Sequence, residues 1–436
     1  MLHQQVKHFV LVNEWTAFHN FMHHSYGHKN MMKNSELIIL PKLMEKGGRV
    51  MHRSRLILPG FGAHDFSFCI PEEHDDPRME LHANHHLLAM LMPAMRVGGK
   101  LTVRGRVDEK LMKSLEGFMH YWVRWCPDRL QMVEIEADEW TTVVPDQENA
   151  AICCFSGGVD SMHAYLRFPK ETGIPVKSLM FMHGYDIDLD RREFYQGVAD
   201  QYEEWFKADS VKLIRLEANA RATAKKFQLN WGSMAHGVFL AAGLHLFSHS
   251  HNKGCIASSD TPSTLIYPWG SNPVTDPLLS GNSMELTHFD CRFSKFDKVK
   301  ELVDHPELCR LLRVCYRSKT EEKNCGRCGK CLRTLIKMHL VRENSWKEAF
   351  PSVANLDEAL ESLEATDFPY AVLQQFAHAR DYALRHATGD LAERLDALID
   401  RKNRQLTPIR TRLRQWFYDR KVRLYVKHPS LIKKDK

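Results

Sequence analysis

Two patterns of apolar and polar residues divide this 436-residue chain. Up to about residue 145, short apolar runs alternate with polar ones, which predicts an N-terminal α+β segment. We expect Pro93 to end its first helix and Asp108 to cap its second. Residues 1–50 show no pattern that we can assign. The predicted strands are 55–58, 66–70, 100–107 and 130–135, and the predicted helices are 81–92 and 108–125.

From residue 151 the patterns of strands and helices alternate. Such alternation predicts an α/β fold with a parallel sheet and helices on both faces, and with ligands bound beyond the carboxyl ends of the strands. Residues after 345 have helical spacing, for example at Phe376, Ala379 and Ala383. We predict domains at 1–145, 146–340 and 341–436. The strands are expected at 151–155, 178–183, 211–216 and 255–259, and the helices at 161–168, 191–206 and 233–247.

Composition and charge narrow the class of protein. The chain is 44% hydrophobic and 26% charged, as in soluble globular proteins, and no apolar stretch is long enough for a membrane span, so we expect a cytoplasmic protein. The net charge of +6 is concentrated at the end, because residues 401–436 hold 13 Lys and Arg against 2 Asp and Glu. With Trp416 and Tyr425 among them, these residues could bind RNA, although a solvated helix face is the interpretation we favour.

A glycine-rich hexapeptide lies between the first strand and the first helix of the parallel sheet. Adjacent glycines let the backbone approach a ligand, and the N–H groups at a helix start attract phosphates. A carboxylate beside phosphates is repulsive unless a cation lies between them, so the aspartate of the hexapeptide predicts Mg²⁺. The alternative is a glycine-rich turn without a ligand. The hexapeptide is Ser156-Gly157-Gly158-Val159-Asp160-Ser161.

Four closely spaced cysteines predict a metal site, since cytosolic proteins rarely use disulfides. Two Cys-x2-Cys steps form a tight knuckle in which Gly326 and Gly329 permit the turn. Four thiolates complete a tetrahedron and leave no open position, so a Zn²⁺ here would be structural. An iron–sulfur cluster is the alternative. The ligands would be Cys315, Cys325, Cys328 and Cys331, with charge offset by Arg327, Lys330 and Arg333.

Several other residues are weaker candidates for binding. His183 and Gly184 end the second strand of the parallel sheet, where they could touch the adenine or a metal, and His183 could equally be a core residue. The pairs His23-His24 and His85-His86 stand in no ligand pattern. Candidates for an acceptor pocket are His236, Gly237, Trp269 and Asp276.

The hexapeptide lacks the Gly-Lys-Ser/Thr ending of a Walker A motif and resembles the PP-loop of the ATP pyrophosphatases. Together, the loop and the cysteine knuckle resemble 7-cyano-7-deazaguanine synthases, over residues 151–339. The resemblance implies adenylylation of a carboxylate by ATP, release of pyrophosphate and nitrogen supplied by ammonia. It also implies a pyrophosphate-facing lysine in Ser294-Lys295-Phe296-Asp297, where Ser294 and Asp297 can form a capping box. Lys295 is the first choice and Lys298 its rival.

The chain departs from that family in three ways. Residues 1–150 and the 105 residues after Cys331 have no counterpart, and we do not find the Pro-Asp-Cys-Arg element of the family's substrate segment. We therefore expect the same activation chemistry on a different, or differently bound, small-molecule acceptor. The predicted enzyme is an ATP-dependent C–N ligase that uses Mg²⁺ and Zn²⁺, with Asp160, Ser156 and Lys295 as its catalytic residues. A homodimer is compatible with the sequence. The alternatives are a tRNA-modifying enzyme of the PP-loop kind and a non-catalytic nucleotide sensor.

Overall fold

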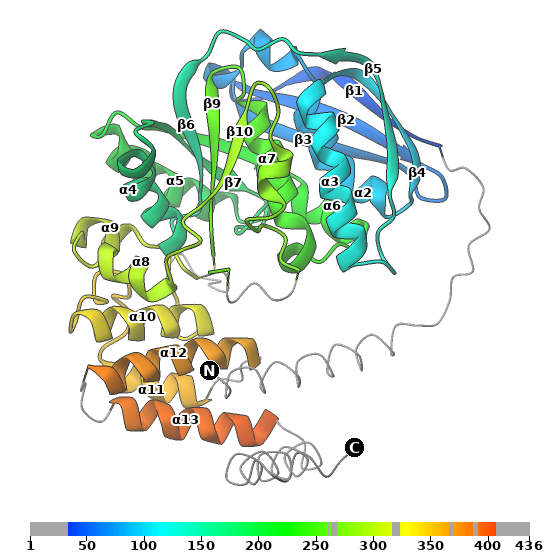
Figure 1. Ribbon diagram of the computed structural model, residues 1–436. Coiled ribbons are helices and arrows are strands. Elements are labelled where there is room, and N and C mark those ends of the chain that lie inside the picture. The colour runs from blue at the N-terminus through cyan, green and yellow to red at the C-terminus, as the bar shows by residue number, and fades with distance from the viewer. Residues whose placement is uncertain are drawn as a thin grey trace, which may run out of the picture.

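The computed structural model describes residues 34–259, 261–262, 268–315, 323–365, 370–386 and 391–406 (Figure 1). The predictions made for His23-His24 and for the basic residues beyond 406 lie outside this part of the chain. Within it, helices flank one long sheet, and a stack of helices lies beside one end of that sheet (Figure 1).

Ten strands form a single sheet with the order β10-β9-β6-β7-β8-β3-β2-β1-β4-β5. The strands are β1 (Asn34–Glu45), β2 (Arg49–Leu58), β3 (Gly62–Pro71), β4 (Gly99–Asp108), β5 (Val133–Thr141), β6 (Glu148–Phe155), β7 (Val176–His183), β8 (Lys212–Ala218), β9 (His251–Ala257) and β10 (Glu285–Phe289).

The sheet has a parallel half and a mixed half. Strands β10, β9, β6, β7 and β8 are parallel neighbours, which confirms the parallel sheet expected after residue 151. Strand β3 then pairs antiparallel with β8, with Phe68 opposite Ala218 and Cys69 opposite Glu217. Strands β2 and β1 continue antiparallel, and β4 and β5 add parallel pairs. The N-terminal segment therefore extends the same sheet across the boundary expected at residue 145.

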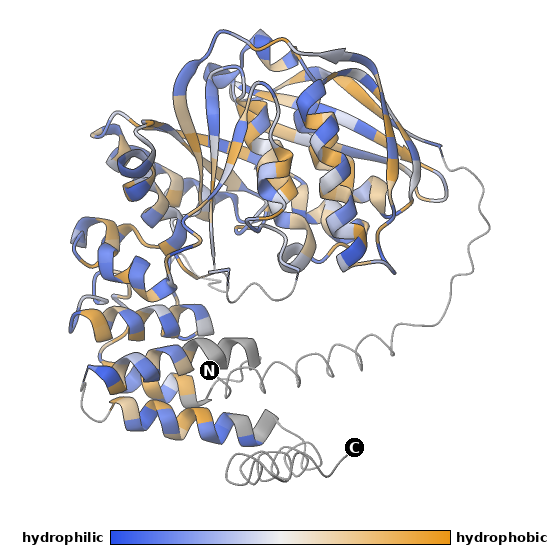
Figure 2. Cartoon of the chain, viewed as in Figure 1, coloured by the Kyte–Doolittle hydropathy of each residue, from blue (hydrophilic) through white to orange (hydrophobic). Residues whose placement is uncertain are grey.

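Alternating side chains on the central strand β6 belong to two core layers. Ile152 and Cys154 pack in a core with the helices α2, α3, α6 and α7, whereas Cys153 and Phe155 pack with α4 and α5. Apolar residues run along the strands and along α7 (Figure 2). Helices thus cover both faces of the parallel half, as predicted. These helices are α2 (Asn84–Met95), α3 (Glu109–Trp125), α4 (Val159–Thr172), α5 (Arg192–Lys207), α6 (Ala220–Lys226) and α7 (His236–Leu246).

The remaining helices stack below the sheet in Figure 1. They are α8 (Lys295–Leu302), α9 (Pro306–Leu311), α10 (Gly329–Val341), α11 (Leu356–Ala365), α12 (Tyr370–Arg385) and α13 (Leu391–Leu406). Short 3₁₀ turns lie at η1 (Glu72–His74), η2 (Pro77–Glu80) and η4 (Asp276–Leu279), and a π-helical turn lies at η3 (Trp231–Ala235). Buried residues recur at the predicted helical spacing on α12 and α13: Phe376, Ala379, Ala383, Leu391, Leu395 and Leu398.

Two expectations about helix ends had different outcomes. The Asp108 cap is confirmed, because its carboxylate accepts a hydrogen bond from the Leu111 N–H at 3.0 Å. The end expected at Pro93 is wrong, since α2 continues to Met95. All residues of α2 are buried, and their packing offsets the backbone hydrogen bond that a proline cannot donate. The local sequence pattern also did not predict strands β1 and β10, and it placed the start of β5 several residues too early.

Candidate functional site

The 156–161 loop lies at the carboxyl end of β6 and leads directly into α4, as the sequence predicted. Gly157 has a φ of 73°, and a Cβ there would lie 1.8 Å from the Tyr202 hydroxyl, so no other residue fits. The Ser161 hydroxyl accepts from the Ser156 N–H at 3.2 Å and donates to the Gly158 carbonyl at 3.1 Å. Gly158 occupies the N-cap and has no side chain to cover the first N–H groups of α4, which leaves this helix end open to an anion.

Asp160, in the first turn of α4, is held between two lysines of α8. Lys295 donates a hydrogen bond to one carboxylate oxygen, and the Lys298 ammonium lies 3.3 Å from the other. Lys298 is buried and also donates to the Ser258 carbonyl at 2.5 Å, whereas Lys295 lines the adjacent cleft. The structure thus brings both candidate lysines to Asp160 and leaves Lys295 facing the cleft.

The charge on Asp160 is already balanced within the protein. Desolvation by surrounding atoms raises its pKa, but the nearby ammonium groups of Lys295 and Lys298 outweigh that effect and hold the pKa below its ordinary value. The sequence argument assigned this balancing role to Mg²⁺, and here two lysines perform it. Mg²⁺ therefore stays a prediction that depends on a bound nucleotide.

Helix α8 presents these lysines because its start is fixed locally. The Ser294 hydroxyl accepts from the Asp297 N–H, and the Asp297 carboxylate accepts from the Ser294 N–H at 2.9 Å. This reciprocal pair is the predicted capping box. It sets the first turn of α8, so that Lys295 and Lys298, three residues apart, lie on the same helix face.

The four predicted metal ligands converge. Their sulfur atoms all lie within 4.8 Å of one another, with separations of 3.5 Å for Cys315–Cys325 and 3.4 Å for Cys328–Cys331. Four thiolates bound at about 2.3 Å to one tetrahedral ion would lie about 3.8 Å apart. The sulfur–sulfur distances of 3.4–3.9 Å agree with this value, so the cluster could hold a single metal ion such as zinc.

The knuckle is built from a loop and the start of α10. Cys328 is the N-cap of α10, and Cys331 lies in its first turn. Gly326 has a φ of 65°, and a Cβ there would lie 2.3 Å from a Val353 methyl carbon, so glycine is required. Gly329 instead begins the helix.

A buried asparagine, to which the sequence analysis assigns no role, ties the knuckle together. The Asn324 carbonyl oxygen accepts from the N–H groups of Val314 and Cys315 at 2.8 and 3.2 Å. Its amide group donates to the carbonyls of Leu312 and Ala349 at 2.7 and 2.9 Å. Its place directly before Cys325 was visible in the sequence, but its partners are brought to it only by folding.

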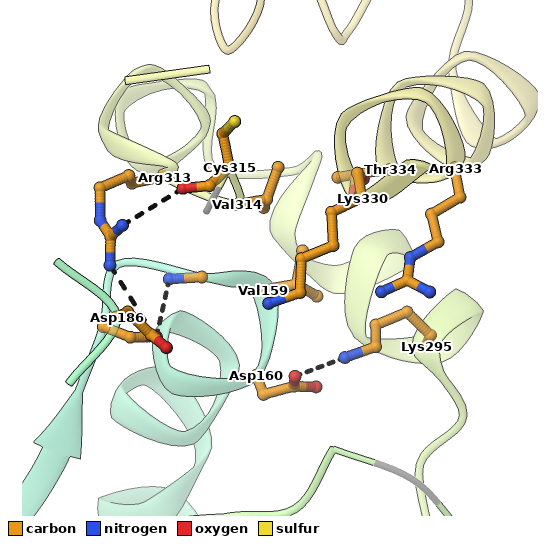
Figure 3. A pocket seen from close by; sticks show the side chains of 12 residues that line it. Val159, Asp160, Asp186, Lys295, Arg313, Val314, Cys315, Lys330, Arg333 and Thr334 are labelled. Carbon is orange, nitrogen blue, oxygen red and sulfur yellow. Dashed lines mark hydrogen bonds and ion pairs between the residues drawn. The ribbon is translucent and has the colours of Figure 1, made fainter. Parts of the chain in front are cut away.

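An open cleft separates the 156–161 loop from the cysteine knuckle (Figure 3). One wall consists of the loop and Lys295, and the opposite wall consists of Arg313–Cys315 and three residues of α10. Four cations and two carboxylates line it, which favours an anionic ligand. The lining residues are Ser156, Gly158, Val159, Asp160, Asp186, Lys295, Arg313, Val314, Cys315, Lys330, Arg333 and Thr334.

Arg313 connects the two walls of the cleft. Nothing in the sequence indicated this role. Its backbone N–H donates to the Gly157 carbonyl at 2.7 Å, and its buried side chain donates to the Cys315 carbonyl at 3.3 Å. Its guanidinium lies 3.9 Å from the Asp186 carboxylate. Desolvation raises the pKa of Asp186, but the positive charges of Lys330 and Arg313 outweigh that effect. The pKa therefore lies below its ordinary value, and Asp186 stays ionised.

His183 and Gly184 do not line this cleft. His183 is fully buried, and its ring nitrogens lie 3.1 Å from a Glu217 carboxylate oxygen and 3.0 Å from the Asp188 carbonyl. Gly184 packs so closely on Ala218 that a Cβ would lie 2.0 Å from its carbonyl oxygen. The sequence left open whether His183 touches the adenine or a metal, or is a core residue. Its placement favours the core role.

The other weak candidates are held within the protein. Asp276 is fully buried and accepts from the Ser271 hydroxyl at 2.6 Å. His236 contacts the Trp231 carbonyl at 3.0 Å and the Trp269 ring, and Gly237 packs on Gly270. On α2, His85 and His86 are buried in the apolar core, and among the described residues no metal-binding group includes them.

The segment between β10 and α8 contains Asp290, Cys291 and Arg292. The Asp290 carboxylate lies 2.7 Å from the His163 ring, and both side chains are buried.

Comparison of the chain with protein-family models, with curated proteins and with solved structures finds no match. Among the described helices, none is both long enough and apolar enough to cross a membrane.

Proposed function

We propose that this chain binds ATP with its phosphates on the 156–161 loop and transfers the adenylyl group to an acceptor, releasing pyrophosphate. The observation that carries the proposal is the position of the loop. It joins the carboxyl end of a central parallel strand to an uncapped helix start and faces a cleft in which cations outnumber carboxylates.

Support for attack at the α-phosphate comes from the resemblance to the PP-loop enzymes. The loop has no Walker lysine for the β- and γ-phosphates, and Asp160 and Ser161 complete the PP-loop pattern instead. The same resemblance supports a carboxylate acceptor and ammonia as nitrogen donor. In this proposal the loop N–H groups and the hydroxyls of Ser156 and Ser161 bind the phosphates, and Lys295 faces the departing pyrophosphate.

Binding of ATP would replace part of the ion pairing that Asp160 already makes with Lys295 and Lys298. Asp160 is bonded to Lys295 and Lys298, so its carboxylate reaches a cation on the nucleotide only if Lys295 turns toward the phosphates. Mg²⁺ held by Asp160 and phosphate oxygens would neutralise charge on the leaving group. Zinc on the four cysteines would hold the opposite wall of the cleft in place.

The test separates the nucleotide products after incubation of the full chain with ATP, Mg²⁺, ammonia and a panel of carboxylic acids. We expect AMP and pyrophosphate. Asp160→Asn should abolish most turnover while retaining one hydrogen-bond acceptor, the amide oxygen, for the buried Lys298. Ser156→Ala should have a smaller effect, because it removes one donor among several. Asp190→Ala, an exposed carboxylate that does not line the cleft, is the control.

Release of ADP and phosphate would contradict adenylyl transfer. Tight binding of ATP without any product, even when host extract is supplied, would favour the nucleotide sensor. Turnover that requires added tRNA would favour the tRNA-modifying alternative.

A further inference from the structure

The cysteine knuckle and the segments on either side of it supply half of the residues that line the cleft. Arg313, Val314 and Cys315 come before the knuckle, and Lys330, Arg333 and Thr334 follow Cys328 on α10. Cys315 is both a metal ligand and a lining residue. The metal centre and the wall opposite the 156–161 loop are therefore one structural unit.

Two cations of this unit point across the cleft. Lys330 and Arg333 are three residues apart on α10, so they share a helix face, and they lie at its N-terminal end. In Figure 3 the Lys330 side chain extends toward Val159 and the Arg333 guanidinium extends toward Lys295. Both therefore approach the loop from the opposite side.

The lining of the cleft carries more positive than negative charge. Its two carboxylates are Asp160, which is paired with Lys295 and Lys298, and Asp186, which faces Arg313 and is also influenced by Lys330. In Figure 3 the side chains of Lys330, Arg333 and Lys295 extend into the same space between the two walls. An anion in that space would offset the excess of positive charge.

A second observation points to the same ligand. Arg313 is 5% exposed, and its Nε has no hydrogen-bond partner among the described residues, although its side chain lines the cleft. A buried donor without a partner is costly, and this one would gain a partner if the side chain turned toward an anion in the cleft.

We propose that Lys330 and Arg333 bind the β- and γ-phosphates of ATP from the knuckle wall and so act as a clamp on the leaving pyrophosphate. This inference rests on the proposed function. A carboxylate oxygen of the acceptor forms a bond to the α-phosphorus, and the bond from that phosphorus to the bridging oxygen breaks. The bridging oxygen leaves with the electron pair as part of pyrophosphate. The clamp places positive charge where this negative charge develops.

The clamp is attached to the loop through the backbone. The Arg313 N–H bonds to the Gly157 carbonyl, and Asn324 binds the neighbouring residues Val314 and Cys315. Ordering of the knuckle by its metal therefore sets the distance between the clamp and the 156–161 loop.

The experiment compares binding of three probes to the metal-loaded full chain by calorimetry: pyrophosphate with Mg²⁺, ATP with Mg²⁺, and AMP. Lys330→Ala and Arg333→Ala should each weaken binding of pyrophosphate and ATP by about 10- to 100-fold, which is the usual loss for one charge-assisted contact. Binding of AMP should change less than about 2-fold. Arg327→Ala is the matched control, because Arg327 is an exposed cation of the same knuckle that does not line the cleft.

Zinc content, measured for every variant, excludes an indirect effect. If Lys330 and Arg333 only offset the thiolate charge, their variants would lose metal, and saturating zinc would restore pyrophosphate binding. That result would overturn the clamp. So would equal losses for AMP and pyrophosphate, or unchanged affinity for both. If the wild-type chain binds ATP and the variants bind it with the same affinity, the clamp alone is refuted. If the wild-type chain binds neither ATP nor pyrophosphate, the proposed function is refuted as well.

Discussion

Replacement of Asn324 by alanine should disconnect the cysteine knuckle from the cleft without touching a metal ligand. Asn324 is buried and makes four hydrogen bonds, to the backbones of Leu312, Val314, Cys315 and Ala349, at 2.7–3.2 Å. Alanine can make none of them. Two N–H groups and two carbonyls would then need new partners in a buried place.

The size of the effect follows from these four bonds. A buried hydrogen bond contributes about 1 kcal/mol net, so the variant should destabilise the ordered knuckle by about 4 kcal/mol. Metal binding is coupled to ordering of its ligands, and each 1.4 kcal/mol is a factor of ten in affinity. Zinc affinity should therefore fall by about a thousandfold. Relaxation of the loop would make the loss smaller.

Competition with a coloured zinc chelator measures this affinity directly. Asn355→Ala is the matched control, since Asn355 is exposed and its side chain accepts one hydrogen bond, from the Glu358 N–H. The control should keep wild-type zinc affinity. If Asn324→Ala also retained zinc within about 3-fold of the wild type, the role of Asn324 in ordering the ligands would be refuted.

Two further predictions concern the loop and the core. Gly157→Ala should cost at least about 2 kcal/mol of stability and abolish ATP binding, because φ is 73° and the new Cβ meets the Tyr202 hydroxyl; a thermal shift and a nucleotide titration equal to wild type would contradict this. Acid should destabilise the protein, since burial lowers the pKa of His86 to about 3 and of His245 to about 4, so only the unfolded chain binds these protons. The two histidines should not reduce the free energy of unfolding above about pH 6.5. Below that pH, each histidine should lower it by about 1.4 kcal/mol per pH unit, down to about pH 4. Urea midpoints that do not change between pH 7.5 and 5.5, or that change equally in His245→Gln, would refute it.

Local features were predictable because their partners lie within a few residues. The Asp108 cap and the Ser294–Asp297 capping box depend on hydrogen bonds that span three positions. The glycine-rich loop was found because a buried strand precedes it and a helix follows it. Pro93 shows the limit of such rules, since packing around α2 outweighed a local signal for a helix end.

The boundaries of the N-terminal segment depended on packing between distant residues. Its strands continue the parallel sheet through the pairing of β3 with β8, which joins residues about 150 positions apart. No periodicity in either strand specifies its neighbour, because alternation reports only which face is buried.

The chain's own sequence determined the local parts of the candidate site, namely a glycine-rich loop between a strand and a helix and four cysteines at metal-ligand spacing. Only the tertiary structure decided how these parts meet. It placed Lys295 and Lys298 on Asp160, bonded Arg313 to the loop, and gave His183 partners in the core. The physical reason is that spacing along a chain specifies local backbone geometry, whereas the approach of side chains from β6, α8 and α10 depends on how whole elements pack.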